Sequence, residues 1–142
     1  MRPGVLALLS AASTSGLKLA IATTTSPVNI AALLRQAIGA DWKQHFSVIE
    51  DASTAPHKKP DPMVYQQTLT RLGLRPEHCL AFEDSENGLH AAMAAGLATV
   101  ITPNDFTAEH DFRGALRTIS SLQGVGVAQL REWHSTFFKA TA

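Results

Sequence analysis

Short apolar runs alternate along the chain with longer segments whose apolar residues recur at helical spacing. The runs have the length and bulk of buried strands and lie at residues 18–22, 46–49, 79–82, 98–101 and 117–122. The segments with helical periodicity lie at residues 3–16, 27–39, 60–73, 89–96 and 128–138. This alternation predicts an α/β fold, with a Rossmann-like parallel sheet flanked by helices through right-handed crossovers.

The first segment admits two interpretations. Arg2 followed by an apolar run and small residues could form a signal peptide, whereas Pro3 at the start and Gly16 at the end are typical of an amphipathic helix. Because the apolar run is short and Ser10 interrupts it, we expect the helix. No stretch approaches the roughly 20 apolar residues that a membrane span requires.

Composition narrows the class of protein. With 142 residues, 45% hydrophobic and 17% charged, the chain is expected to form one soluble globular domain over residues 1–142. A formal net charge of zero gives no electrostatic reason to expect nucleic acid or an anionic membrane as a partner. The single cysteine, Cys79, excludes an internal disulfide, and we interpret it as a packing residue compatible with a cytoplasmic location.

Two acids, Glu83 and Asp84, directly follow the predicted strand at residues 79–82. A strand that ends in acids and turns into a helix places them at its carboxyl end, where open α/β sheets bind ligands. Paired carboxylates there suit a hard divalent cation such as Mg²⁺, which proteins hold through oxygen atoms. The same acids could instead cap the first turn of the following helix, because they complement its dipole.

Two other strand ends carry polar groups. Four hydroxyl residues follow the strand at 18–22, namely Thr23, Thr24, Thr25 and Ser26. Hydroxyls and free N–H groups at a helix start suit a phosphate oxyanion, although the same residues could simply cap the helix. Lys59, beside Pro60, could neutralise a phosphoryl group or a metal-bound carboxylate, or it could remain solvated. A hydroxyl, a lysine and an acid pair in this order are more specific than any one of them alone.

In this order the residues resemble the motifs of the haloacid dehalogenase-like phosphohydrolases, over nearly the whole chain. Thr23, after Leu-Ala-Ile-Ala, is similar to the second motif, a hydroxyl that hydrogen-bonds the transferring phosphoryl group. Lys59, in Lys-Pro-Asp-Pro, is similar to the third-motif lysine that stabilises this group and the nucleophile. Residues 82–88, Phe-Glu-Asp-Ser-Glu-Asn-Gly, are similar to the fourth motif, which implies Glu83 and Asp84 as Mg²⁺ ligands.

The subgroup is also indicated. Thr-Thr-Thr-Ser-Pro at residues 23–27 and Lys-Pro-Asp-Pro at 59–62 most resemble the CbbY-type and β-phosphoglucomutase-like proteins, which act on phosphorylated sugars. The resemblance therefore implies a small phosphorylated metabolite as the partner, with Thr24, Thr25 and Ser26 as candidate substrate-binding residues.

The family's first motif has no counterpart here. That motif is a strand followed by Asp-x-Asp, whose first Asp is the nucleophile and whose second is the general acid/base. None of the six aspartates, at positions 41, 51, 61, 84, 105 and 111, has another aspartate two positions away. The helical cap domain is also missing, so the chain resembles only the carboxyl-terminal part of such an enzyme, a partial core domain from Arg2 onward.

The missing motif has consequences for the fold and for catalysis. In this family the nucleophile strand lies at the centre of the three-layer core, between the strands found here at 18–22 and 79–82. Its absence leaves two apolar edges, which invite pairing with other chains. We expect the isolated chain to be poorly stable, to pair these two strands directly, or to borrow a strand. Lacking the carboxylate nucleophile, it should show no appreciable phosphatase turnover alone.

Three functions remain open from the sequence. The chain could be a truncated copy of a Mg²⁺-dependent phosphosugar phosphatase or mutase. It could be a non-catalytic phosphate-binding or interaction module. It could complete an active enzyme with a separate chain that supplies Asp-x-Asp, or associate with itself through its open sheet edges.

Overall fold

The computed structural model describes residues 2–141, with side chains through residue 138. The helices are α1 Val5–Thr14, α2 Pro27–Ala37, α3 Met63–Leu72, α4 Glu86–Ala94 and α5 Val127–Thr141. The strands are β1 Ala20–Ala22, β2 Val48–Glu50, β3 Leu80–Glu83, β4 Ala98–Ile101 and β5 Arg117–Thr118. Two short 3₁₀ helices occupy Trp42–His45 and Pro76–His78. Each predicted strand and helix is therefore confirmed in kind and order, including the helix at the start of the chain.

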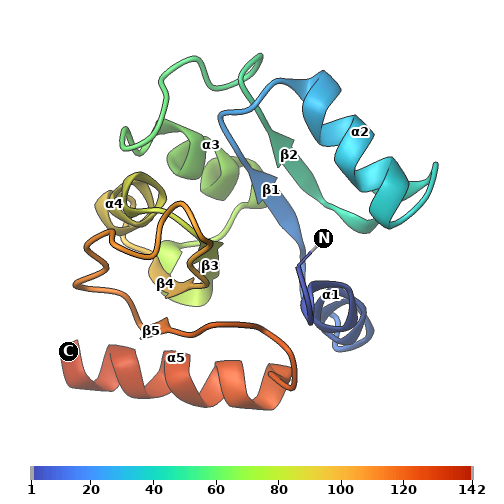
Figure 1. The fold of residues 1–142 in the computed structure, drawn as a ribbon. Helices are drawn as coiled ribbons and strands as arrows, with labels where there is room; N and C mark the ends of the chain where they lie inside the picture. The colour runs from blue at the N-terminus through green and yellow to red at the C-terminus, as the bar shows by residue number, and fades with distance from the viewer. Residues whose placement is uncertain (1, 142) are drawn as a thin grey trace.

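All strand pairs in the described residues are parallel, but they form two sheets (Figure 1). β1 pairs with β2, Ala20 opposite Val48, and the second sheet has the order β3–β4–β5, Leu80 opposite Ala98. The facing edges of β1 and β3 do not pair with each other within residues 2–141, so direct pairing, one of the three alternatives expected for the isolated chain, is wrong. Three-residue β1 carries a ladder on one side only, and its other edge remains unpaired within the described chain.

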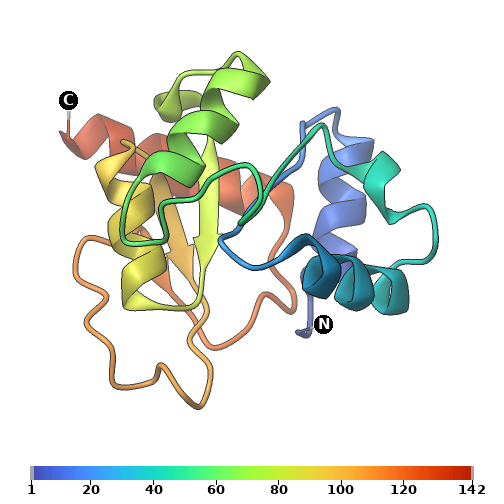
Figure 2. The ribbon, with the colours of Figure 1, turned by 90° about the horizontal axis from the view of Figure 1, so that it is seen from above.

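Helices cover both faces of the strands, which confirms the predicted α/β class. α3 packs on β1 and β2 and also contacts α4, which packs on β3 and β4. Figure 2 shows β3 and β4 between α4 on one side and α5 on the other. One buried cluster lies between α3 and α4. It includes Val64 and Leu69 of α3 and, from α4, Ala91 and Ala92, which follow the buried Leu89. This layer joins the two sheets, because α3 and α4 cover one sheet each and contact one another.

Two further clusters lie on the outer faces. α2 contributes Ile30 and Leu34, which pack with Trp42 against the two-stranded sheet. α1 and α5 contribute Leu8 and Leu130 to a cluster that covers the three-stranded sheet. Trp42 is only 3% exposed, so the 3₁₀ helix Trp42–His45 is anchored in this cluster by its first residue.

Element boundaries differ from the expected ones near the acid pair. α4 begins at Glu86, three residues before the expected start at Leu89, because the hydroxyl of Ser85 accepts a hydrogen bond from the Gly88 N–H (3.1 Å) and caps the helix. β3 correspondingly extends through Glu83. The last strand is reduced to two residues of the predicted 117–122. None of the described helices combines the length and apolar character that a membrane crossing requires.

Candidate functional site

Lys59 connects the ends of two strands that belong to different sheets. Its ammonium group donates a hydrogen bond to the carbonyl of Ala22, at the end of β1 (3.0 Å), and another to the carboxylate of Glu83, at the end of β3. The two charged side chains are 15% and 9% exposed, so this ion pair is largely screened from water. An ammonium has three N–H donors, so one remains for a further acceptor such as an anion.

Tyr65 completes this contact and was not singled out by the sequence pattern. This α3 residue is buried, and its hydroxyl donates to the same Glu83 oxygen that Lys59 contacts. The Lys59 nitrogen also lies 5.1 Å from the centroid of the Tyr65 ring, a cation–π distance. Burial first, and then the negative charge of Glu83, raise the pKa of Tyr65 well above its ordinary value. Tyr65 is therefore held as a hydrogen-bond donor.

A tyrosine in a buried helical stripe is the signal that could have identified this residue. The phenol hydroxyl of a buried tyrosine normally finds a partner. Val64 and Leu69 mark the buried face of α3, and Tyr65 lies on that face. α3 begins at Met63, four residues after Lys59, so this signal would have suggested a charged group at a strand end near Lys59 as the partner of Tyr65.

The hydroxyl turn after β1 is ordered by its own hydrogen bonds. The Thr23 hydroxyl accepts from the Thr25 N–H (3.1 Å) and lies 3.0 Å from the Thr25 hydroxyl. Ser26 caps α2, with its oxygen accepting from the Asn29 N–H (3.4 Å), as the capping alternative predicted. The Thr24 hydroxyl makes no hydrogen bond within the described part of the chain. Because Thr23 directly follows Ala22, the Lys59 contact brings this turn to the same edge as Glu83.

The two acids occupy different environments. Glu83 lies against the first turn of α4, where a Cβ on Gly88 would come within 2.1 Å of its Oε2. Asp84 is exposed, and its Oδ2 accepts from the side-chain amide of Asn104 (3.1 Å), beyond the end of β4. The cap of α4 is Ser85, so neither acid plays the capping role that the sequence left open. Like Tyr65, Asn104 contacts one of the two acids and was not indicated as functional by the sequence, although it also follows a strand.

Glu83 and Asp84 provide the type of ligand that a hard cation prefers, but fewer ligands than it requires. Carboxylate oxygens are the ligands that Mg²⁺ prefers, and Mg²⁺ requires about six oxygens in octahedral geometry. Within residues 2–141, no group of three or more His, Cys, Asp or Glu residues could hold a metal ion. One Glu83 oxygen is already engaged by Lys59 and Tyr65. Among the described residues, Asp84 and the second oxygen of Glu83 are therefore the carboxylate donors at this edge, and further ligands would come from water or from other groups.

The chain is similar in sequence to known proteins. A family model described as haloacid dehalogenase-like hydrolase matches residues 1–96. The "Protein CbbY, plasmid" of Cupriavidus necator is 46% identical over a 158-residue alignment that covers 99% of this chain and 62% of that protein. The phosphorylated carbohydrates phosphatase of Thermotoga maritima is 35% identical over 98 residues, covering 69% of this chain and 44% of that protein.

The fold also matches solved structures. The crystal structure of CbbY from Rhodobacter sphaeroides in complex with phosphate superposes with a TM-score of 0.88 at 40% identity, covering 92% of this chain and 58% of that chain. A mutant of the same protein, in complex with xylulose-(1,5)bisphosphate, gives the same TM-score and identity. The chain thus spans about three-fifths of the length of these relatives.

Proposed function

The chain belongs to the haloacid dehalogenase-like hydrolase family, and we propose that it forms the phosphoryl-binding part of a Mg²⁺-dependent phosphohydrolase acting on small phosphorylated sugars. The observation that carries this proposal is the Lys59 bridge, which gathers Thr23, Lys59 and the acid pair at one edge although they lie far apart in the sequence. In this proposal residues 1–142 constitute a partial core domain.

Each residue has a distinct role in the proposed site. The remaining N–H of Lys59 neutralises a phosphoryl oxygen, and Glu83 with Tyr65 keeps the ammonium in place. The Thr23 hydroxyl donates to a second phosphoryl oxygen, and the Thr24 and Thr25 hydroxyls contact the rest of the substrate. Asp84 and Glu83 would hold Mg²⁺, which supplies positive charge to the phosphoryl group when bound. Ser26 already caps α2, which makes it the weakest of the substrate-binding candidates.

The nucleophile must come from outside these residues. No Asp-x-Asp occurs in the sequence, and the β1 and β3 edges that face each other have no ladder partner among residues 2–141. We propose that one additional parallel strand, carrying Asp-x-Asp, occupies the position between them and brings its first carboxylate to the Lys59 edge. That strand would belong to a longer form of this protein or to a complementing chain.

The names of the relatives support the proposed substrate class. Among the similar proteins, one CbbY binds phosphate and its mutant binds xylulose-(1,5)bisphosphate, and another relative is a phosphatase for phosphorylated carbohydrates. These names support a phosphorylated sugar as the substrate of the complete enzyme.

A phosphate-release assay tests the proposal. The purified chain is incubated with Mg²⁺ and a panel of sugar phosphates, alone and with a polypeptide that carries the Asp-x-Asp strand and cap of a family member. We expect no turnover from the chain alone and turnover from the mixture, lost when Lys59→Ala or Asp84→Asn is introduced. Robust turnover from the chain alone, abolished by Asp84→Asn, would contradict the requirement for an external nucleophile.

A phosphate-binding module without turnover is the second candidate. The absence of Asp-x-Asp favours it, because the charge and hydroxyl groups that bind a phosphoryl oxygen are present without a nucleophile. Binding of a sugar phosphate that depends on Lys59, combined with no turnover in any complemented mixture, would select this candidate. Conversion of one sugar phosphate to an isomer by the mixture would instead indicate a mutase.

A further inference from the structure

A surface cavity of about 420 Å³, wide open to solvent, lies between β2 and α3, apart from the groups proposed for phosphoryl binding. Its walls are formed by the end of β2, the loop after it and one face of α3, through Glu50, Thr54, Gln66, Gln67, Thr70 and Arg71. None of Thr23, Lys59, Glu83 or Asp84 lines it. The volume lies within the range of small-molecule sites, about 300–1,000 Å³.

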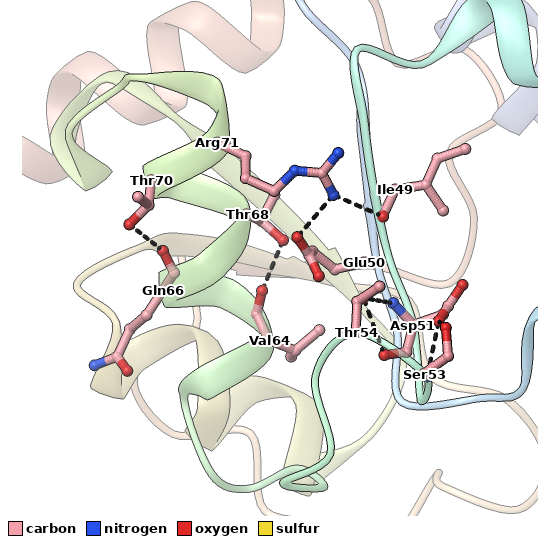
Figure 3. A network of polar contacts seen from close by, with 10 residues as sticks. All are labelled: Ile49, Glu50, Asp51, Ser53, Thr54, Val64, Gln66, Thr68, Thr70 and Arg71. Carbon is pink, nitrogen blue, oxygen red and sulfur yellow. Dashed lines mark hydrogen bonds and ion pairs between the residues drawn. The ribbon is translucent and has the colours of Figure 1, made fainter.

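Glu50 is a buried carboxylate that is only half satisfied. Glu50 is 2% exposed, and its Oε1 accepts a hydrogen bond from the Arg71 guanidinium (2.9 Å), as Figure 3 shows. Its Oε2 is closed off from solvent and has no hydrogen-bond partner among the described residues. A buried carboxylate oxygen without a hydrogen-bond donor is unfavourable, so an N–H or O–H group of a ligand would stabilise it.

Arg71, the partner of Glu50, has N–H donors that are not used within the described residues. Its Nη1 donates both to Glu50 and to the carbonyl of Ile49 (3.1 Å), while its Nε and Nη2 make no hydrogen bond within the part of the chain that the structure describes (Figure 3). The side chain is 52% exposed. A guanidinium offers its remaining N–H groups in a planar fork that matches a carboxylate.

The other walls are polar and uncharged. The side-chain amides of Gln66 and Gln67 make no hydrogen bond to residues that the structure describes, so both can donate and accept. The Thr70 hydroxyl donates to the Gln66 carbonyl (3.0 Å) and the Thr54 hydroxyl to the Asp51 carbonyl (3.3 Å), so these oxygens serve a ligand mainly as acceptors. The cavity therefore presents one negative and one positive group, side by side, among neutral groups.

We propose that this cavity binds a small zwitterion, an α-amino acid, whose ammonium group donates to Glu50 Oε2 and whose carboxylate accepts from Arg71. Glu50 lines the cavity but its Oε2 is closed off from solvent, so binding in this proposal requires a rotation about the terminal torsion of the side chain, which is soft, to expose Oε2 to the ligand. A phosphate dianion would meet the negative charge of Glu50, and a simple amine would leave the Arg71 fork without an acceptor. A zwitterion satisfies both groups.

Calorimetry on the 142-residue chain tests this proposal. The individual proteinogenic amino acids are titrated, and the best binder is compared with its methyl ester and its N-acetyl derivative. We expect at least one to bind with a stoichiometry of one, and either derivative to bind about tenfold more weakly or worse, because each loses a charge-assisted hydrogen bond. Failure of every amino acid to bind at millimolar concentration, or equal binding of both derivatives, would overturn the proposal.

Variants separate binding from stability. Glu50→Gln should weaken binding about tenfold or more, whereas Glu77→Gln, which alters an exposed ion pair with Arg75 outside the cavity, should leave it unchanged. Because Glu50 also joins β2 to α3, Gln67→Ala provides a second test: it should weaken binding without changing thermal unfolding. Binding of sorbitol or inorganic phosphate at this cavity, in preference to every amino acid, would also overturn the proposal.

Discussion

At the level of single residues, the contacts of one oxygen, Glu83 Oε1, hold the candidate phosphoryl site together. Glu83 Oε1 accepts from both Lys59 and Tyr65, which come from a loop and from α3. Two donors on one carboxylate oxygen restrict the position of the ammonium more than an exposed ion pair does. The position of Lys59 is therefore determined by burial and by neighbours from three segments.

The pH titration of Tyr65 tests this arrangement, because it is the single tyrosine of the sequence. Burial and the charge of Glu83 raise its pKa, so the folded chain in metal-free buffer should show no tyrosinate absorbance at the ordinary pKa of about 10, where the urea-unfolded chain is half ionised. Since the folded-state pKa lies above the unfolded value, this contribution to stability is present below about pH 10 and is lost as the pH rises toward the folded-state pKa.

Glu83→Gln is the matched variant for that titration. It removes the negative charge but keeps the burial of Tyr65, so the tyrosine pKa should fall toward its ordinary value without reaching it. Coincident titration curves for the folded and unfolded wild-type chains would contradict the buried contact.

Asp84 leads to a prediction about metal binding. The chain offers two neighbouring carboxylates, one of them engaged by Lys59, so Mg²⁺ should bind only weakly, on the order of millimolar. Calorimetry should show this weak binding decrease further in Asp84→Asn but not in Asp111→Asn, whose carboxylate pairs with Arg113. Tight, specific binding by the unmodified chain would show that further ligands exist within these residues.

At the scale of secondary-structure elements, α3 and α4 connect the site to the core. α3 packs on β1 and β2 and supplies Tyr65 to the site and Arg71 to the Glu50 pair. α4 follows Glu83 after two residues, and the Ser85 cap determines where it begins. The start of α4 therefore also determines how closely its first turn approaches Glu83.

Gly88→Ala tests that approach. Alanine in a helix is normally more favourable than glycine by about 1 kcal/mol, but here the added Cβ would lie 2.1 Å from Glu83 Oε2, and Lys59 and Tyr65 hold this carboxylate in place through its other oxygen. We expect the substitution to lower the free energy of unfolding by about 1–3 kcal/mol instead, measured by urea denaturation.

Asn87→Ala is the control for this helix. Asn87 is exposed, so its replacement should be neutral or slightly stabilising. If Gly88→Ala proved as stable as Asn87→Ala, Glu83 would not lie against this turn of α4.

At the scale of the whole molecule, two small parallel sheets share one helical layer. The edges of β1 and β3 that face one another carry no ladder partner within residues 2–141. Unpaired edges are templates for pairing with other chains. The same feature therefore underlies both the proposed insertion of a strand and a tendency to self-associate.

Self-association is measurable by sedimentation velocity over a range of chain concentrations. We expect the average mass to rise with concentration, and Phe82→Lys, in β3 and 40% exposed, to reduce this rise because a lysine at a strand edge opposes pairing. Phe106→Lys is the matched control: this residue is 93% exposed but lies in a loop, so it should change the association less. A monomer at every concentration, or equal effects of both substitutions, would contradict association through the strand edge.

The order and type of the elements, and the polar groups at the strand ends, could be predicted from the sequence. Apolar periodicity and turn residues are local properties, so the strand at Ala98–Ile101 and the end of α3 at Gly73 could be located without coordinates. Family motifs then related Thr23, Lys59 and the acid pair to one another.

Which side chains contact one another could not be predicted from the sequence and depends on the packing of the elements. The contact of Tyr65 with Glu83, the burial of Glu50 against Arg71 and the failure of β1 to pair with β3 all join segments distant in sequence. Such contacts depend on how helices and sheets pack, and a polar residue at a strand end looks the same in the sequence whether it is buried or solvated. The Lys59 bridge therefore emerged as a physical contact only once both strand ends were placed in space.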